Sequence, residues 1–292
     1  MSIATEIQRL QQAKSDLKTS IQAKGVTVSS EVKLDEYPNL VDSIQTGGSD
    51  VTPYKDFIEG TTDNIPDGVT KLRSYCFCGQ HNSQHTIPSS VTHLSKHCFY
   101  KFSYGFQKNQ SIIIPDTVTS VDDYCFDETG SNASGMSITI KGVNELSKWM
   151  FNNCYLSGFP IINPSITEFP ERCFDGTHFI GAESSTEQVV QIPSQIKTIN
   201  VGCFSDCHAK RIIVPDTVET ISLDNAFYSY YLTQLQFLSP TPPTFIKTLT
   251  DGLIYINRCK IYVPNEAVDT YKSNESLSRY VSQIYPASEM PA

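Results

Sequence analysis

One stretch of this chain reads Ile112-Ile113-Ile114-Pro115-Asp116-Thr117-Val118, then Val121, then Cys125-Phe126, and the same pattern occurs seven times. In each copy an Ile or Val is followed by two further apolar positions and then by phenylalanine, and in six of the seven copies a Cys or Ala directly precedes that phenylalanine. The copies begin at Ile65, Ile87, Ile114, Ile140, Ile162, Ile192 and Val214. A regular spacing of 22 to 30 residues is typical of a solenoid, in which equivalent turns of the chain stack on one another.

Two copies depart from the pattern. The fourth, with Ile140, Val143, Leu146 and Met150-Phe151, is one residue short, and the fifth has Asn163 where five copies have proline. No copy is large enough to bury its own apolar side chains, so each must pack against its neighbours. The β-branched runs before the prolines favour strands, and proline ends them because it cannot donate a backbone hydrogen bond. We therefore expect stacked β-coils with Ile, Val, Phe and small residues inside.

The pattern resembles the BspA-type leucine-rich repeat over about residues 57–238. The segments Phe151-Asn152-Asn153-Cys154 and Phe204-Ser205-Asp206-Cys207 keep the trailing cysteine of that repeat. Residues 239–292, with Ile261-Tyr262-Val263-Pro264, look like the cap that closes such arrays. The resemblance implies a mainly β leucine-rich-repeat solenoid with a C-terminal cap that contains a helix. It also implies adhesion or recognition and no enzymatic activity.

Residues 2–24 follow a different, helical pattern. Apolar residues spaced by three, four and seven predict a short coiled coil whose oligomerisation seam is formed by Ile3, Ile7, Leu10, Leu17 and Ile21. The choice of Ile and Leu favours two strands, and Gly25 offers a stop. The alternative is an amphipathic helix that folds back on its own domain.

Residues 1–45 resemble the N-terminal module of many tailed-phage virion proteins, through the stretch IATEIQRLQQAKSDLKTSIQAKGVTV and the segment that follows it. Residues 46–56 then form a Gly/Ser/Pro linker. This resemblance implies a homotrimer, with the dimer as the alternative from the heptads. It also implies attachment to other virion proteins, of the capsid or the tail, through residues 1–45.

Composition excludes some functions and leaves others open. A net charge of −9 argues against nucleic acid as a partner, and no apolar run is long enough for membrane insertion or for a signal peptide. Five of the nine cysteines occupy the small position of the repeat, which favours buried free thiols and assembly in a reducing cytoplasm. Whether any cysteines form disulfides stays open.

Motifs for chemistry are weak. Cys76, Cys78, His81 and His85 have a zinc-like spacing, but Cys76 belongs to the stacking position, so we expect no metal and no cofactor. Cys98 beside His97 lacks the geometry of a nucleophile and base. Pairs such as Asp122-Asp123 and Asp127-Glu128 could flank a glycosidic bond, although solvated loop charges are by far the commoner explanation of such pairs. We therefore expect no enzyme; a carbohydrate-active enzyme is the remaining catalytic hypothesis.

Aromatic residues are the best candidates for a ligand surface. The residues alternate along one segment and cluster in another: Tyr100, Phe102, Tyr104 and Phe106, then Tyr228, Tyr230 and Tyr231. On an extended segment the first four would face one way, and tyrosine-rich surfaces bind sugars and proteins. The alternative is that these rings close the outer side of the solenoid. A ligand site would lie at the long insertions, residues 100–111, 127–137 and 176–188.

The sequence thus predicts a tailed-phage virion fibre that is assembled in the host cytoplasm and presents its solenoid to a bacterial surface glycan or protein. The alternative is a bacterial cell-surface adhesin of the same repeat family.

Overall fold

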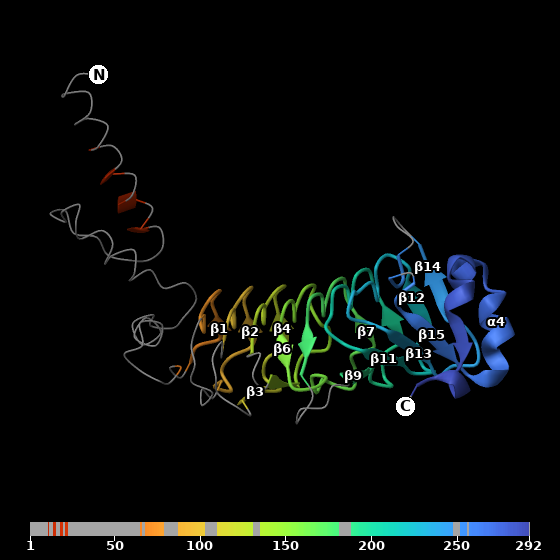
Figure 1. The fold of residues 1–292 in the computed structure, drawn as a ribbon. Coiled ribbons are helices and arrows are strands. Elements are labelled where there is room, and N and C mark those ends of the chain that lie inside the picture. Colours follow the sequence, from red (N-terminus) through yellow and green to blue (C-terminus); the bar gives the residue numbers. More distant parts are fainter. Residues whose placement is uncertain are drawn as a thin grey trace, which may run out of the picture. The chain divides into compact units, whose positions relative to one another are not determined.

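The computed structural model describes residues 65, 68–78, 87–102, 110–130, 135–180, 188–247, 252–255 and 257–291, and seven residues between 11 and 22. The chain divides into two compact units, Met1–Val69 and Thr70–Ala292. All strands described below belong to the second unit (Figure 1).

In the first unit the described residues between 11 and 22 are helical. The hydroxyl of Thr19 donates to the carbonyl oxygen of Ser15 at 3.0 Å, one helical turn away. Of the five predicted seam residues only Ile21 is described, and it is buried within the single chain. Ile3, Ile7, Leu10 and Leu17 lie outside the described residues, so the coiled coil and the oligomer stay predictions.

The second unit is a solenoid of parallel strands. Each turn of the chain is called a coil. On one face of the solenoid, called the first face, coils 1–3 contribute short strands to one sheet and coils 5–8 contribute strands to a second sheet. The first sheet contains β1 (Lys71–Leu72), β2 (His93–Leu94) and β4 (Ser120–Val121). The second contains β7 (Glu168–Phe169), β10 (Thr198–Ile199), β12 (Thr220–Ser222) and β14 (Thr244–Ile246).

The remaining strands of the solenoid form two further parallel sheets. One contains β3 (Gln110–Ile114), β5 (Met136–Ile140), β6 (Tyr155–Leu156) and β8 (His178–Phe179). The other contains β9 (Val189–Gln191), β11 (Arg211–Val214), β13 (Gln234–Phe237), β15 (Lys260–Val263) and β16 (Ile284–Pro286). Figure 1 shows the coils following one another from β1 to the C-terminal cap.

The core confirms the predicted stacking. One phenylalanine per coil lies almost parallel to the next, with ring centroids 4.6 to 5.6 Å apart, in the row Phe77, Phe99, Phe126, Phe151, Phe174, Phe204 and Phe227. The small residues before them, Cys98 and Ala226 among them, are buried too. Because a large ring alternates with a small side chain, successive coils approach closely. The row therefore supplies continuous apolar burial along the solenoid.

Coil 4 interrupts the first face. Because its copy is one residue short, Gly142 lies so close to coil 3 that a Cβ there would be 2.1 Å from the carbonyl oxygen of Asp116. In coils 2 and 3 the amides of Ser95 and Asp122 donate to the preceding coil, but among the described residues no such bond joins the amide of Ser147 in coil 4 to coil 3. Pro170 of coil 5 has no N–H to donate to coil 4. The sheet of β1, β2 and β4 consequently ends at β4, and the next sheet on this face begins at β7.

An eighth coil follows the seven copies. Phe237 pairs in register with Val214 of coil 7, Phe245 pairs with Ile221, and the amide of Phe227 donates to Leu253. The cap adds β15, β16 and the helices η2 (Asn265–Ala267), α4 (Val268–Lys272), η3 (Glu275–Gln283) and η4 (Ala287–Glu289). Buried Tyr271 and the other apolar residues of the cap cover the last coil. A closing cap with a helix therefore agrees with the prediction.

Candidate recognition surface

In coils 1 to 5 one position combines an unusual backbone with a large side chain. The residue before the buried small residue has a left-handed φ of 54° to 61° at Tyr75, His97, Tyr124, Trp149 and Arg172. Its carbonyl oxygen accepts the amide three residues later, and its own amide donates to the next coil, as in Tyr75 to His97 at 3.1 Å. Left-handed backbone disfavours residues other than glycine, so the fold holds these side chains in place at some cost.

These side chains form a row that we call the aromatic ladder: Tyr75, His97, Tyr124 and Trp149, with Arg172 at its end. Neighbouring ring centroids are 5.1, 5.2 and 5.3 Å apart, and the guanidinium of Arg172 lies 4.8 Å from the centre of the Trp149 ring. Tyr75 is 52% exposed. Since the rings stack on one another along the solenoid, their faces are largely in mutual contact.

Two carboxylates, those of Asp127 and Asp175, lie next to side chains of the ladder. The Nδ1 atom of His97 is 3.4 Å from the carboxylate of Asp127, which also accepts a hydrogen bond from Asn152 at 2.8 Å. Burial lowers the pKa of His97 and Lys96 lowers it further, while Asp127 opposes them. Burial raises the pKa of Asp127. The guanidinium of Arg172 donates to the carboxylate of Asp175 at 2.6 Å, which holds the end of the ladder in place.

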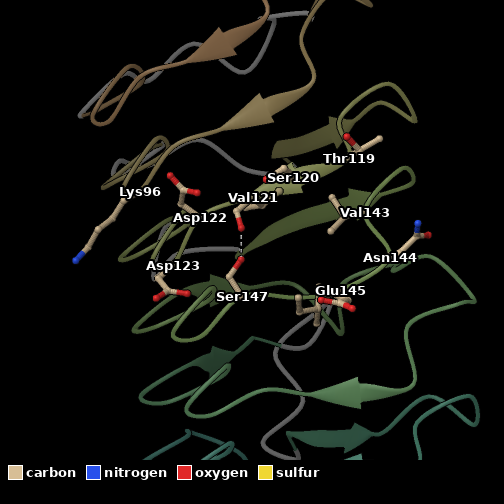
Figure 2. A pocket seen from close by; sticks show the side chains of 11 residues that line it. Lys96, Thr119, Ser120, Val121, Asp122, Asp123, Val143, Asn144, Glu145 and Ser147 are labelled. Carbon is tan, nitrogen blue, oxygen red and sulfur yellow. Dashed lines mark hydrogen bonds between the residues drawn. The ribbon is translucent and has the colours of Figure 1, made fainter.

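A groove of about 580 Å³ opens beside the ladder, where coil 4 leaves the strand register. Its residues come from coils 2, 3 and 4: Lys96, Thr119, Ser120, Val121, Asp122, Asp123, Val143, Asn144, Glu145, Leu146 and Ser147. The hydroxyl of Ser147 donates to the carbonyl oxygen of Val121, in place of the missing backbone bond. Figure 2 shows Asp122 and Asp123 on one side of this bond and Glu145 on the other.

A second row of rings lies four residues after the phenylalanines of coils 4 to 7. Tyr155, His178, His208 and Tyr231 stack with centroids 4.3, 3.5 and 3.6 Å apart, and we call them the imidazole ladder. Burial, and secondarily the neighbouring His208, lowers the pKa of His178 to about 4. Burial also lowers the pKa of His208. Both imidazoles are therefore neutral at pH 7, which allows their close contact.

The structure places the predicted ligand residues in different environments. Tyr228, Tyr230 and Tyr231 are 37%, 54% and 47% exposed, and Arg258 lies 3.6 Å from the centre of the Tyr230 ring. Their surface position agrees with the prediction, and ligand binding there stays untested. Tyr100 is half-buried, and its hydroxyl donates to Glu128 at 3.1 Å.

The expectation that Tyr100 and Phe102 face the same way is wrong. Residues 99–102 form a turn, with a left-handed φ of 52° at Lys101, rather than an extended segment. Phe102 is consequently buried against Phe77 and Phe99 and belongs to the core. Tyr104 and Phe106, and much of the long insertions, lie outside the described residues.

The sequence analysis did not predict the aromatic ladder, because a ligand surface was expected at the insertions between repeats. Its signal is present in the sequence, since Tyr75, His97, Tyr124 and Trp149 each precede the small–phenylalanine pair. An equivalent signal exists for the imidazole ladder, because Tyr155 and His208 directly follow Cys154 and Cys207. Residues at the same position of successive repeats align in space, so an aromatic residue that recurs at one position predicts a row of stacked rings.

Metal and membrane sites receive no support in the described part of the chain. No group of three His, Cys, Asp or Glu residues there is arranged to hold a metal ion. His81 and His85 are outside that part, and Cys78 is exposed. None of the described helices has the length and hydrophobicity that a membrane span requires.

Comparison with known proteins identifies the repeat. The profile of the BspA-type leucine-rich repeat region matches in six copies, over residues 57–181, 102–229 and 182–274. A crystal structure of a leucine-rich cell surface protein from Faecalibacterium prausnitzii shares 20% identity with the chain, at a TM-score of 0.30. The aligned part covers 60% of this chain and 59% of that protein. No curated protein matches.

Proposed function

Because the chain belongs to the BspA-type leucine-rich repeat family, we propose that it is an adhesin-like recognition protein displayed on a bacterial surface and without enzymatic activity. The aromatic ladder beside the groove is the observation that carries this proposal. Tyrosine, tryptophan and arginine are the residues enriched where proteins bind partners, and here coils 1, 3, 4 and 5 each place one of them at the left-handed position. The partner is a protein or glycan outside the cell.

A binding experiment tests the role. The labelled full chain is applied to bacterial cells and to arrays of extracellular proteins and surface glycans, and we expect saturable binding to at least one of them. The double variant Tyr124→Ser and Trp149→Ser should weaken that binding about tenfold or more, since hot-spot aromatics dominate interface energies. Tyr285→Ser, in the cap, is the matched control. No saturable binding, or binding that the double variant leaves unchanged, would reject the proposal.

A virion fibre is the second candidate, favoured by the likeness of residues 1–45 to phage virion modules. In that case the same solenoid meets the bacterial surface from a phage particle, and a trimer raises its avidity by linking three sites. Deleting residues 1–24 should turn an oligomer into monomers while the solenoid stays folded, as light scattering would measure. Antibody labelling of intact producing cells and of purified virions separates the two candidates.

A carbohydrate-active enzyme is the third reading, since Asp122 and Asp123 line the groove together with Glu145. Incubation of the chain with capsular polysaccharide, followed by measurement of new reducing ends, tests it. Under the main proposal the polysaccharide stays uncut. Turnover that disappears in Asp123→Asn and Glu145→Gln would overturn the non-enzymatic proposal.

A further inference from the structure

The groove lies at coil 4, where the backbone hydrogen bonds that join successive coils on the first face are interrupted. In coils 1 and 2 the carbonyl oxygens of Thr70 and Thr92 each accept amides from the next coil. Thr119 is the equivalent residue of coil 3, and among the described residues no hydrogen bond reaches its carbonyl oxygen. The edge of β4 therefore offers a free backbone acceptor to the groove, of the kind that an added polypeptide uses.

The charges of the groove favour a cation. Asp122, Asp123 and Glu145 line it, against the single ammonium of Lys96, which lies 4.8 Å from the centre of the Tyr124 ring. One oxygen of Asp122 is 3.2 Å from Nε2 of His93, and one oxygen of Asp123 accepts the amide of Lys148 at 3.1 Å, so each of these carboxylates keeps a second oxygen for a ligand. The other nearby ammonium, that of Lys148, is paired with Glu171 at 2.8 Å. An anionic ligand would meet repulsion here, whereas a guanidinium or ammonium would find several acceptors.

The apolar lining fits the stem of a long basic side chain. Val121 is half-buried and supplies the accessible apolar surface of the groove, while Val143 and Leu146, which are 2% and 8% exposed, lie beneath it. Lysine and arginine bury their methylene groups on such surfaces while their charged ends stay hydrogen-bonded. The groove thus matches both parts of these side chains.

The aromatic ladder next to the groove favours a polypeptide ligand over a sugar. Sugars stack on free ring faces, but the faces of Tyr124 and Trp149 are turned toward each other at 5.3 Å, and Arg172 covers the far side of Trp149. Ring edges, the Arg172 guanidinium and polar groups remain for contact, as in protein interfaces.

We propose that the groove and the aromatic ladder dock a basic segment of a protein partner, with a lysine or arginine side chain in the groove between Asp122, Asp123 and Glu145. This inference rests on the proposed recognition role and names the partner's chemistry. The segment follows the edge of β4, and its flanking residues contact the ladder.

Trp149 is the only tryptophan of the chain, so its fluorescence reports on this site alone. The full chain is titrated with a blocked peptide of alternating glycine and arginine, and we expect a saturable change that weakens as salt rises. The triple variant Asp122→Asn, Asp123→Asn and Glu145→Gln should weaken it about tenfold or more. The charge-matched control, Asp216→Asn, Glu266→Gln and Asp269→Asn, should bind like the unaltered chain.

A second variant tests the groove itself. One alanine inserted between Lys141 and Gly142 restores the usual spacing of the copy and should close the groove, with loss of peptide binding and an unchanged circular dichroism spectrum. If the insertion variant does not fold, the peptide affinity of the isosteric triple variant still tests the proposal. No saturable change with the peptide, or equal affinity of the triple variant, would overturn the proposal.

Further probes identify the source of the cation. A peptide of alternating glycine and glutamate, spermidine and the neutral sugar cellohexaose should each leave Trp149 fluorescence unchanged where the basic peptide saturates. An equal response to spermidine or cellohexaose would overturn a polypeptide partner. Surface binding that persists without peptide binding would refute this inference and leave the recognition role standing, whereas loss of surface binding would remove both.

Discussion

At the scale of single residues, the position before each small–phenylalanine pair separates surface from core. Tyr75, Tyr124 and Trp149 point outward from left-handed backbone, while the two residues after each of them are buried. Gly202 occupies this position in coil 6, where no aromatic ring contributes to the surface. Substitutions at this position can therefore alter the recognition surface with little change to the core.

The stacked phenylalanines should dominate stability. Phe126→Ala removes a fully buried ring that contacts Phe99 and Phe151, and large-to-small changes of this kind cost about 3–5 kcal/mol. Urea unfolding followed by circular dichroism measures the loss. Tyr230→Ala, at an exposed ring, is the control and should change stability much less. A Phe126→Ala midpoint equal to that of the control would contradict the stacking.

The imidazole ladder should make stability depend on pH. The pKa of His178 is about 4 in the folded chain against 6.5 for a free histidine, so the unfolded chain binds the proton first. Stability from this pair is therefore fully present above about pH 6.5 and is lost as the pH falls toward 4. Thermal melting from pH 7 to 4 should fall more steeply in the unaltered chain than in His178→Tyr.

The matched control is His93→Gln, because His93 lies 3.2 Å from Asp122 and is not part of the imidazole ladder. This variant should keep the steep dependence of the melting temperature on pH. Identical slopes for His178→Tyr and the unaltered chain would show that the imidazole contact does not carry the effect.

At the scale of elements, the irregular copy is the informative one. Gly142 has space for no side chain, since a Cβ would meet the carbonyl oxygens of Asp116 and Val118, whereas Gly158 has nothing within 4 Å. We expect Gly142→Ala to cost roughly 1–3 kcal/mol through overcrowding and Gly158→Ala to cost far less. Thermal unfolding of both variants measures the difference in stability. Equal melting temperatures would contradict the overcrowding and show that the backbone of coil 4 shifts to make room for the methyl group.

The sequence predicted the coils because each apolar position of the repeat is dictated by burial. Ile114, Val118, Cys125 and Phe126 are all buried as expected. The eighth coil was not predicted, since Phe237, Phe245 and Leu253 keep its apolar positions without the Ile-Pro signature. The groove could not be foreseen either: a copy shortened by one residue predicts an irregularity, but its volume depends on how neighbouring coils close around it.

At the scale of the whole molecule, the nine cysteines should differ sharply in reactivity. Only Cys78 is exposed, and the other eight are buried as free thiols. Burial raises the pKa of Cys98, Cys173 and Cys203 well above the usual value, which removes the reactive thiolate. Iodoacetamide under native conditions should therefore modify one thiol, and nine in denaturant, as intact mass spectrometry would count. Rapid native labelling of several thiols would contradict the buried positions.

The turns that carry the phenylalanines stay hydrogen-bonded through coil 4, from Phe126 to Met150 at 3.0 Å and from Phe151 to Cys173 at 2.9 Å, although the strands of the first face do not. A pulling force along the axis is thus transmitted past coil 4 by the phenylalanine turns and by the sheet of β3, β5, β6 and β8, but not by the first face. In the proposed adhesin-like role, such uneven attachment would let the array bend at coil 4 under load before it breaks. Mechanical compliance would then be concentrated where the partner is held.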